Sequence, residues 1–405
     1  MSAASPAVSP SLRSDATIIS LVGFAHGTSH FFHFVLPPLF PYLMAQFGLS
    51  FTQVGALMTA FFVVSGVGQA LAGFVVDRFG AFRVLCGGMA LLACSGLLLA
   101  SAGSYAGLMV AAAVAGLGNS VFHPADFTLI NRRVSTPRLG HAFSVHGLSG
   151  SLGWAAAPVF VLALAETWGW RSAGIGASLV GFAALAMLVA NRYRLAVAAL
   201  PADAAKHPGG SFAFLGAGVV WMCFLFFMLT VMAFGGLQNF APPIFERTYG
   251  VTLAAATTAL TAYLLGNAAG IAAGGFLASK GERQEQLIAA ALGFGALCAL
   301  LIASGWVSAW MLPGLMALMG FGVGLANPSR DMLVRRAATS TFGQAAFGRI
   351  YGFVYSGIDT GLAIAPIAFG LLMDSGRFAQ VLWGVAALQV VAIGTALLVG
   401  SRARS

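Results

Sequence analysis

Residues 116–133 read GLGNSVFHPADFTLINRR, and this stretch decides how the rest of the chain is interpreted. It places Asn119, His123 and Asp126 inside an otherwise apolar segment that ends with two arginines. A second copy, GVGLANPSRDMLVRR, occupies residues 322–336. A polar patch that recurs within an apolar helix predicts two related halves, with the working centre close to the repeated segments.

Composition defines the solvent in which the chain folds. Hydrophobic residues make up 59% of the 405 positions and charged residues only 8%, whereas a soluble domain has about a quarter of its residues charged. We therefore expect a polytopic membrane protein. The net charge of +9 is explained by membrane topology, so no nucleic-acid partner is expected. The four cysteines lie in apolar runs without metal or disulfide spacing.

Apolar segments of about 20 residues predict the membrane spans. We expect an all-α protein with twelve transmembrane helices, near residues 16–43, 52–76, 82–102, 106–131, 141–166, 171–192, 213–240, 251–278, 286–304, 309–333, 350–373 and 378–400. They predict a disordered tail at 1–15, an N-terminal six-helix bundle at 16–192, a cytoplasmic linker at 193–212, a C-terminal six-helix bundle at 213–400 and a second tail at 401–405.

The positive charges predict the orientation, because Lys and Arg in short loops stay on the cytoplasmic side. With both termini inside, most of the twenty basic residues lie in inner loops or tails. Only Arg171, Arg247 and Arg377 then lie outside, and Arg330 lies within a span. We expect a multi-pass protein of a cell membrane, such as a bacterial inner membrane, and a monomer surrounded by lipid.

Residues 73–83, GFVVDRFGAFR, resemble the inner-loop motif of the major facilitator superfamily. The matching positions are Gly73, Asp77, Arg78, Gly80 and Arg83, and the resemblance implies that they form a cytoplasmic gate. Glycine permits close helix approach, and an aspartate at a helix end can pair with arginines or with a neighbouring helix. Two halves that run in the same direction are the parallel repeat of this fold.

Within that superfamily the chain is most similar to the fosmidomycin resistance group of exporters. The similar stretches are HFFHFVLPPLFPYL, FHPADFTLINRR and GHAFSVHGLSGSLGWAAAP, at residues 30–43, 122–133 and 140–158. The chain has Phe34 where the group often carries an aspartate, and Ala157 followed by Pro158 in place of the Gly-Pro pair of antiporters.

His26, His30 and His33 follow the spacing i, i+4 and i+7, so they share one face of the first span. Histidine titrates near neutral pH, which favours a proton relay or a substrate-binding wall. Hydrogen bonding for packing is the alternative. No Cys or carboxylate lies near them in the sequence, so no resident metal ion or cofactor is expected.

Titratable groups within a span are functional candidates because the bilayer disfavours them. Asn119, His123 and Asp126 share an arc of one helix, and Asp126 is the expected coupling carboxylate. A structural ion pair with an arginine is the alternative. We also expect Pro124 to kink this helix.

The second half supplies further polar candidates. They are Gln238, Asn239, Asn327, Arg330, Asp331 and Asp359. An intramembrane arginine needs a partner, which is either a carboxylate or an anionic substrate.

We therefore expect a secondary transporter that works by alternating access on a small molecule and protons, and not an enzyme. The sequence contains no P-loop, so ATP is not the energy source. Proton-coupled export of a small anionic or amphiphilic compound is the first hypothesis, resting mostly on the resemblance. Uptake of an organic anion, or transport of a metal or metal chelate on the histidine face, are the alternatives.

Overall fold

The computed structural model describes residues 12–135, 138–196, 216–280, 283–342 and 347–402, and every regular element in them is a helix. The first half contains α1 (Leu12–His33), η1 (Pro37–Leu39), α2 (Phe40–Phe47), α3 (Phe51–Phe79), α4 (Ala81–Ser101), α5 (Tyr105–Asn119), α6 (Phe122–Arg133), α7 (Leu139–Trp168), α8 (Trp170–Ala190) and α9 (Arg192–Leu195). The second half contains α10 (Gly218–Tyr249), α11 (Leu253–Lys280), α12 (Gln284–Ala303), η4 (Ala309–Met311), α13 (Leu312–Phe342), α14 (Phe347–Asp374) and α15 (Phe378–Arg402).

Eleven helical segments among the described residues are long and apolar enough to cross a membrane. The remaining long helix, α1, is not one of them because its three histidines and the charges at its start lower its hydropathy. It nevertheless packs along α7, which is one of the eleven. The eleven segments and α1 together make up the expected membrane fold of twelve helices.

Proline interrupts two of the expected spans. The span expected at 16–43 ends as a regular helix at His33, and the chain continues through η1 and α2. Pro37 and Pro38 lack the backbone N–H that a continuous helix needs there. The span expected at 106–131 is two helices, because α5 ends at Asn119 and α6 begins at Phe122. The kink expected at Pro124 is thus present, as a two-residue break within one membrane span.

The cause of the second interruption is Pro124. Within a continuous helix its N–H would bond the carbonyl of Ser120, and proline has none. The series of i to i−4 backbone hydrogen bonds stops with the bond from Ser120 N to Gly116 O. It resumes with the bond from Ala125 N to Val121 O. Asn119 therefore lies on a different helix from His123 and Asp126.

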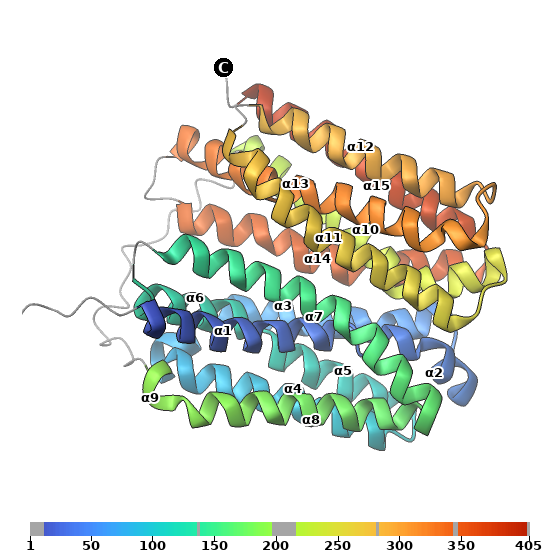
Figure 1. Ribbon diagram of the computed structural model, residues 1–405, viewed down its shortest axis with the longest axis horizontal. Coiled ribbons are helices and arrows are strands. Elements are labelled where there is room, and N and C mark those ends of the chain that lie inside the picture. Colours follow the sequence, from blue (N-terminus) through green and yellow to red (C-terminus); the bar gives the residue numbers. More distant parts are fainter. Residues whose placement is uncertain (1–11, 136–137, 197–215, 281–282, 343–346, 403–405) are drawn as a thin grey trace, which may run out of the picture.

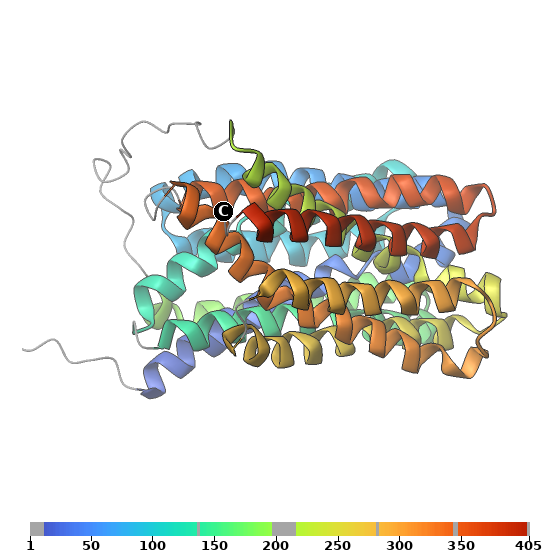
Figure 2. The ribbon, with the colours of Figure 1, turned by 90° about the horizontal axis from the view of Figure 1, so that it is seen from above.

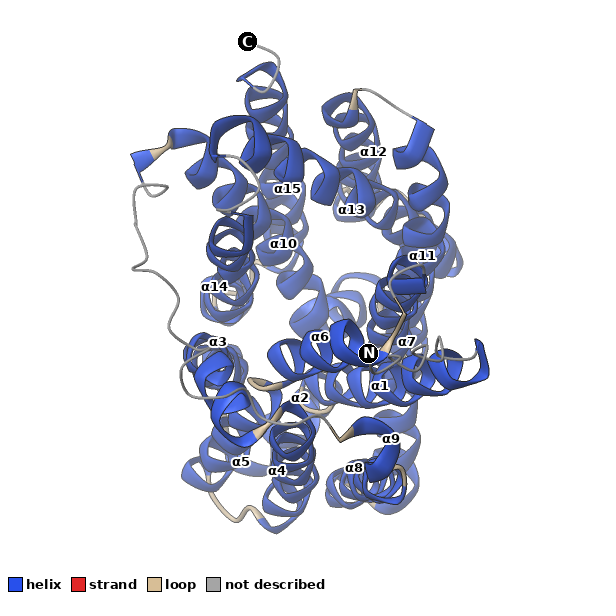
Figure 3. Ribbon diagram, turned by 90° about the vertical axis from the view of Figure 1, so that its left-hand side faces the viewer, coloured by secondary structure: helices blue, strands red, loops and turns tan. Residues whose placement is uncertain are grey.

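The helices form two bundles with parallel long axes (Figures 1 and 2). α1 to α9 lie on one side in Figure 1, and α10 to α15 lie on the other. α3 packs against α14, and α7 packs against α11, so each pair joins the two bundles (Figure 3). The start of α1 and the end of α15 lie at the same end of the molecule, which agrees with an even number of passes.

The α3–α14 pair is closely packed from its middle to the end away from the termini. Thr59 Oγ1 donates to Ala363 O at 2.7 Å. A Cβ at Gly55 would lie 2.4 Å from Pro366 O, so only glycine permits this approach.

At that far end the Asp374 carboxylate spans the two bundles. It accepts hydrogen bonds from Phe51 N at 2.6 Å and from Thr52 N at 2.9 Å, and a third from the Thr52 hydroxyl. These are free N–H groups of the first turn of α3. The carboxylate of one bundle therefore caps a helix of the other.

Candidate functional site

The close crossing of α1 and α7 brings the histidine face of α1 into the N-terminal bundle. A Cβ at Gly153 would lie 2.0 Å from the carbonyl oxygen of Gly27, so the two backbones are in contact. One turn away, a Cβ at Gly150 would lie 2.7 Å from His30 Nδ1 and 3.0 Å from His26 Nε2. Both imidazoles therefore face the same point on α7.

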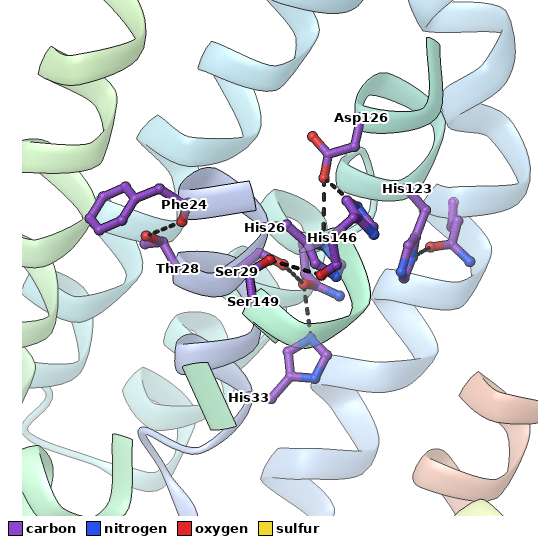
Figure 4. Close-up of polar contacts among 11 residues, drawn as sticks. Phe24, His26, Thr28, Ser29, His33, His123, Asp126, His146 and Ser149 are labelled. Carbon is purple, nitrogen blue, oxygen red and sulfur yellow. Dashed lines mark hydrogen bonds and ion pairs between the residues drawn. The ribbon is translucent and has the colours of Figure 1, made fainter. Parts of the chain in front are cut away.

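Asp126 lies on α6 and is fully buried. Its Oδ2 lies 3.2 Å from His146 Nε2 and 3.5 Å from His26 Nδ1 (Figure 4). The His26 and His146 rings stack with their centroids 3.5 Å apart. Among the described residues Asp126 Oδ1 is buried without a hydrogen-bond partner. The described neighbours of this carboxylate are thus imidazoles, whereas the sequence alternative was an arginine.

Asn119 is the centre of a second network. Its Oδ1 accepts from Ser29 Oγ at 3.0 Å and lies 2.9 Å from His33 Nε2, while its Nδ2 donates to Ser65 Oγ at 2.9 Å. Trp154 Nε1 lies 3.2 Å from His33 Nδ1. An indole N–H can only donate, so His33 Nδ1 accepts and the ring proton is on Nε2. Asn119 and Trp154 therefore hold His33 in one tautomer.

His123 belongs to a third chain of contacts, which crosses from one bundle to the other. Its Nδ1 lies 3.0 Å from Gln69 Oε1, and Gln69 Nε2 donates to Asp359 Oδ2 at 3.3 Å. The amide oxygen can only accept, so His123 donates from Nδ1 and its Nε2 is left as an acceptor. One glutamine on α3 thus connects a histidine of α6 to a carboxylate of α14.

Gln238 and Asn239 lie fully buried on α10. Gln238 Nε2 donates to the backbone oxygen of His33 at 2.9 Å, which is another contact between the bundles. Asn239 Nδ2 instead donates to Gly235 O of its own helix at 2.6 Å. Gln238 therefore lies beside the histidine face, whereas the amide nitrogen of Asn239 serves its own helix.

Three further candidates, Asn327, Arg330 and Asp331, lie on α13. The guanidinium carbon of Arg330 lies 4.3 Å from the centroid of the Phe227 ring, a cation–π distance. Asn327 is half-buried. The side chain of Asp331 is outside the described part of the chain.

The inner-loop motif forms the connection between α3 and α4. Gly80 ends one helix and begins the next with φ +85°, a conformation that favours glycine. Arg78 and Arg83 are exposed, and the Arg78 guanidinium lies 5.3 Å from the Phe79 ring centroid. The surroundings of Gly73 and of the Asp77 side chain lie outside the described residues.

Sequence reasoning did not single out His146, Gln69 or Trp154. His146 could have been found, because it is a histidine within a span, which is the property that identified the other candidates. Gln69 and Trp154 carry no charge, and their importance comes from the side chains that packing places beside them.

Comparison with known proteins gives relatives that are transporters. The chain is 28% identical over 157 residues to the fosmidomycin resistance protein of Escherichia coli (strain K12), a match that covers 39% of this chain and 38% of that protein. It is 25% identical over 392 residues to an uncharacterized MFS-type transporter of Bacillus subtilis (strain 168), covering 94% of this chain and 92% of that one. The first match is thus confined to less than half of each protein.

Solved structures show the same fold. A bacterial homolog to the human lysosomal transporter Spinster, in an inward-facing and occupied conformation, superimposes with a TM-score of 0.71 over 98% of this chain and 97% of that one, at 13% identity. Such low identity shows the fold alone.

The family model described as Major Facilitator Superfamily matches residues 22–338 and 224–405. These matches span well over half of the chain, and the relatives support a multi-pass secondary transporter. The protein belongs to the Major Facilitator Superfamily.

Proposed function

We propose that the protein is a proton-coupled transporter that exports a small anionic or amphiphilic compound by alternating access. The observation that carries this proposal is the Asp126 carboxylate, buried in the membrane bundle between His26 and His146. A purely structural carboxylate at this depth would be expected to have both oxygens bonded. Asp126 Oδ1 accepts no hydrogen bond from the described residues, which supports a role in binding a transported proton.

Coupling requires that protonation favours one arrangement of the bundles over another. The chain from His123 through Gln69 to Asp359 supports such coupling, because the Gln69 amide joins a titratable group of one bundle to a titratable group of the other. Protonation of Asp359 would remove the negative charge that accepts the hydrogen bond from Gln69 Nε2, and this would weaken that hydrogen bond. Proton occupancy in one bundle would then change the energy of the contact with the other.

Substrate class and direction rest on two further features. The relative named for fosmidomycin resistance motivates export of an anion as the first hypothesis. Imidazole N–H groups and the Arg330 guanidinium can donate to an anion, which also suits the alternative of proton-coupled anion uptake. We place both termini in the cytoplasm, the inner-loop motif at a cytoplasmic gate and the monomer in a bacterial inner membrane, following the distribution of basic residues.

Flux in proteoliposomes tests the proposal. Purified protein is reconstituted, a pH gradient is imposed, and movement of fosmidomycin and a panel of organic anions is measured in both directions. We expect gradient-driven flux for the wild type and at least a tenfold loss of the gradient-driven part for Asp126→Asn. Glu166→Gln, which changes an exposed carboxylate on α7, is the matched control and should keep full coupling.

Two results would count against the proposal. One is flux of a transported compound that ignores the pH gradient. The other is an Asp126→Asn variant that couples as well as Glu166→Gln. A resistance screen with deletion and overexpressing strains identifies which compounds to test, and the direction of flux separates export from uptake.

A further inference from the structure

The N-terminal bundle brings histidines from three helices to one place, which their positions in the sequence do not show. His26 and His30 lie on α1, His123 on α6 and His146 on α7 (Figure 4). One ring nitrogen from each of His26, His30 and His123 lies within 4.8 Å of the other two. A second set with the same property consists of His26, His146 and Asp126.

Ring geometry distinguishes the two sets. Imidazole nitrogens bind zinc at about 2.0–2.1 Å, so two rings that share an ion have centroids roughly 5 Å apart. His26 and His146 are stacked with centroids only 3.5 Å apart, which does not allow both lone pairs to point at one ion. His26 and His123 are 5.3 Å apart, and His30 lies 4.2 Å from His26 and 6.2 Å from His123. The first set fits a shared ion.

The partners of the other ring nitrogens favour the same set. A histidine that binds a metal usually donates its second N–H to a carboxylate, an amide oxygen or water, which orients the ring. Gln69 Oε1 takes this position at His123 Nδ1, at 3.0 Å. Asp126 Oδ2 lies 3.5 Å from His26 Nδ1. In His123 Nε2 is therefore the nitrogen available to an ion, whereas Asp126 lies beside Nδ1 of His26 without a hydrogen bond to it among the described residues.

The third ring has a nitrogen without a partner. His30 Nδ1 is buried and has no hydrogen bond among the described residues. It lies with His26 Nε2 over Gly150, where a side-chain carbon would be 2.7 Å and 3.0 Å from the two nitrogens. The glycine thus lets both nitrogens lie close together against the α7 backbone.

We propose that His26, His30 and His123 form a binding site for a divalent transition-metal ion, with Asp126 and Gln69 as the outer partners that orient the rings. Tetrahedral coordination holds ligand atoms about 3.3 Å apart, so separations of up to 4.8 Å must close by at most about 1.5 Å. Imidazole ligands suit Zn²⁺, Ni²⁺ and Cu²⁺ and not Mg²⁺ or Ca²⁺. The charge of Asp126 offsets part of the charge of a buried cation.

The site is tested by metal binding to the purified full-length chain, without any flux measurement. Zn²⁺ and Ni²⁺ are titrated against a chromophoric chelator, the bound metal is counted after desalting, and Mg²⁺ is the negative control. We expect one Zn²⁺ per wild-type chain, and thermal stabilisation that grows with Zn²⁺ concentration. His26→Gln, His30→Gln and His123→Gln should each weaken binding by more than about 100-fold.

Matched variants separate ligands from partners. Asp126→Asn and Gln69→Ala should weaken binding by about 10- to 100-fold, as the loss of an outer partner typically does. Gly150→Ala leaves every ligand in place but fills the space beside His30 Nδ1, so it should also weaken binding. His141→Gln, on the exposed face of α7, should bind Zn²⁺ like the wild type.

The proposal fails if the wild type binds no Zn²⁺ in excess of the Mg²⁺ control. It also fails if the three ligand variants, shown to be folded by their elution as single species, bind like His141→Gln. Neither failure would touch proton coupling, because the flux assay runs in metal-free buffer. A wild-type protein that binds Zn²⁺ but shows no gradient-driven flux would conversely overturn the proposed function alone.

Discussion

Removing the Asp374 carboxylate should change which conformation the two bundles adopt. Asp374 accepts hydrogen bonds from two backbone N–H groups and one hydroxyl at the start of α3, across the boundary between the bundles. In alternating access these contacts exist only when this end of the molecule is closed. Asp374→Ala should therefore destabilise the closed end in particular.

The size of the effect follows from the number and exposure of these bonds. Losing a capping side chain typically costs 0.5–2 kcal/mol, and a negative charge at a helix N-terminus contributes about 0.3–1 kcal/mol when exposed. Asp374 is exposed, so the lower parts of these ranges apply. We expect a shift of about 1–2 kcal/mol, which is roughly a 5- to 30-fold change in the ratio of closed to open molecules.

Pulsed electron paramagnetic resonance between spin labels at Gly103 and Trp306 measures this ratio. Both positions are exposed on connections at the same end as Asp374, one in each bundle, and the four native cysteines are first replaced. Ser50→Ala is the control, because Ser50 caps the same helix through Gln53 of its own bundle. It should lower thermal stability without changing the distance distribution.

The reasoning would be refuted by a distance distribution that Asp374→Ala leaves unchanged. It would also be refuted if Ser50→Ala shifted the distribution as much, because loss of a helix cap alone would then explain the result.

Two further predictions concern stability in detergent. Gly153→Ala should lower the unfolding temperature by a few degrees, because its Cβ would meet the Gly27 carbonyl at 2.0 Å and overpacking costs about 1–3 kcal/mol. Gly147→Ala is the control, because a Cβ there has nothing within 4 Å. Equal losses for the two variants in a thermal-shift assay would contradict the close crossing of α1 and α7. Desolvation raises the pKa of Asp15, but the hydrogen bonds that its carboxylate accepts, including one from Arg138 at 2.5 Å, outweigh it and hold the pKa below its ordinary value. The stabilising effect of the Asp15 carboxylate is thus present above about pH 4 and lost as pH falls through the folded pKa. Asp15→Asn should therefore unfold at a lower temperature than the wild type at pH 7, and the two unfolding temperatures should converge in acid. A difference in unfolding temperature that stays constant with pH would argue against the contact.

Predictions that depend on the periodicity of a single helix agree with the structure, whereas contacts between helices could not be predicted from the sequence. The shared face of His26, His30 and His33 follows from helical periodicity, and in the structure all three approach neighbouring helices of the same bundle. Asn119 and Asp126 likewise both approach the histidine face of α1, at His33 and His26, although Ser120 and Val121 interrupt the helix between them. The contact of Asp126 with His146 on α7 does not follow from that periodicity.

The partners of these groups lie far away in the sequence, so no spacing rule could identify them. His146 follows Asp126 by a whole loop and a helix start, and Asp359 reaches Gln69 from the other half of the chain. Arg330 illustrates the same limit. Its depth in α13 predicted a need for a partner, and one contact that the structure shows is the Phe227 ring of α10, which charge pairing does not suggest.

The two polar contacts between α3 and α14 have different consequences because they lie at different depths. Asp359 meets Gln69 near the middle of the helix pair, and Asp374 meets Thr52 at its far end. Fifteen residues of helix separate the two carboxylates, a distance of roughly 22 Å. A rigid-body rotation of about 10–15°, pivoting near Asp359, would move Asp374 by about 4–6 Å. The contact between Asp374 and Thr52 must then break, whereas the contact between Asp359 and Gln69 can persist. Under the proposed mechanism Gln69 can therefore connect the two bundles in both conformations, and Asp374 can act only as a gate.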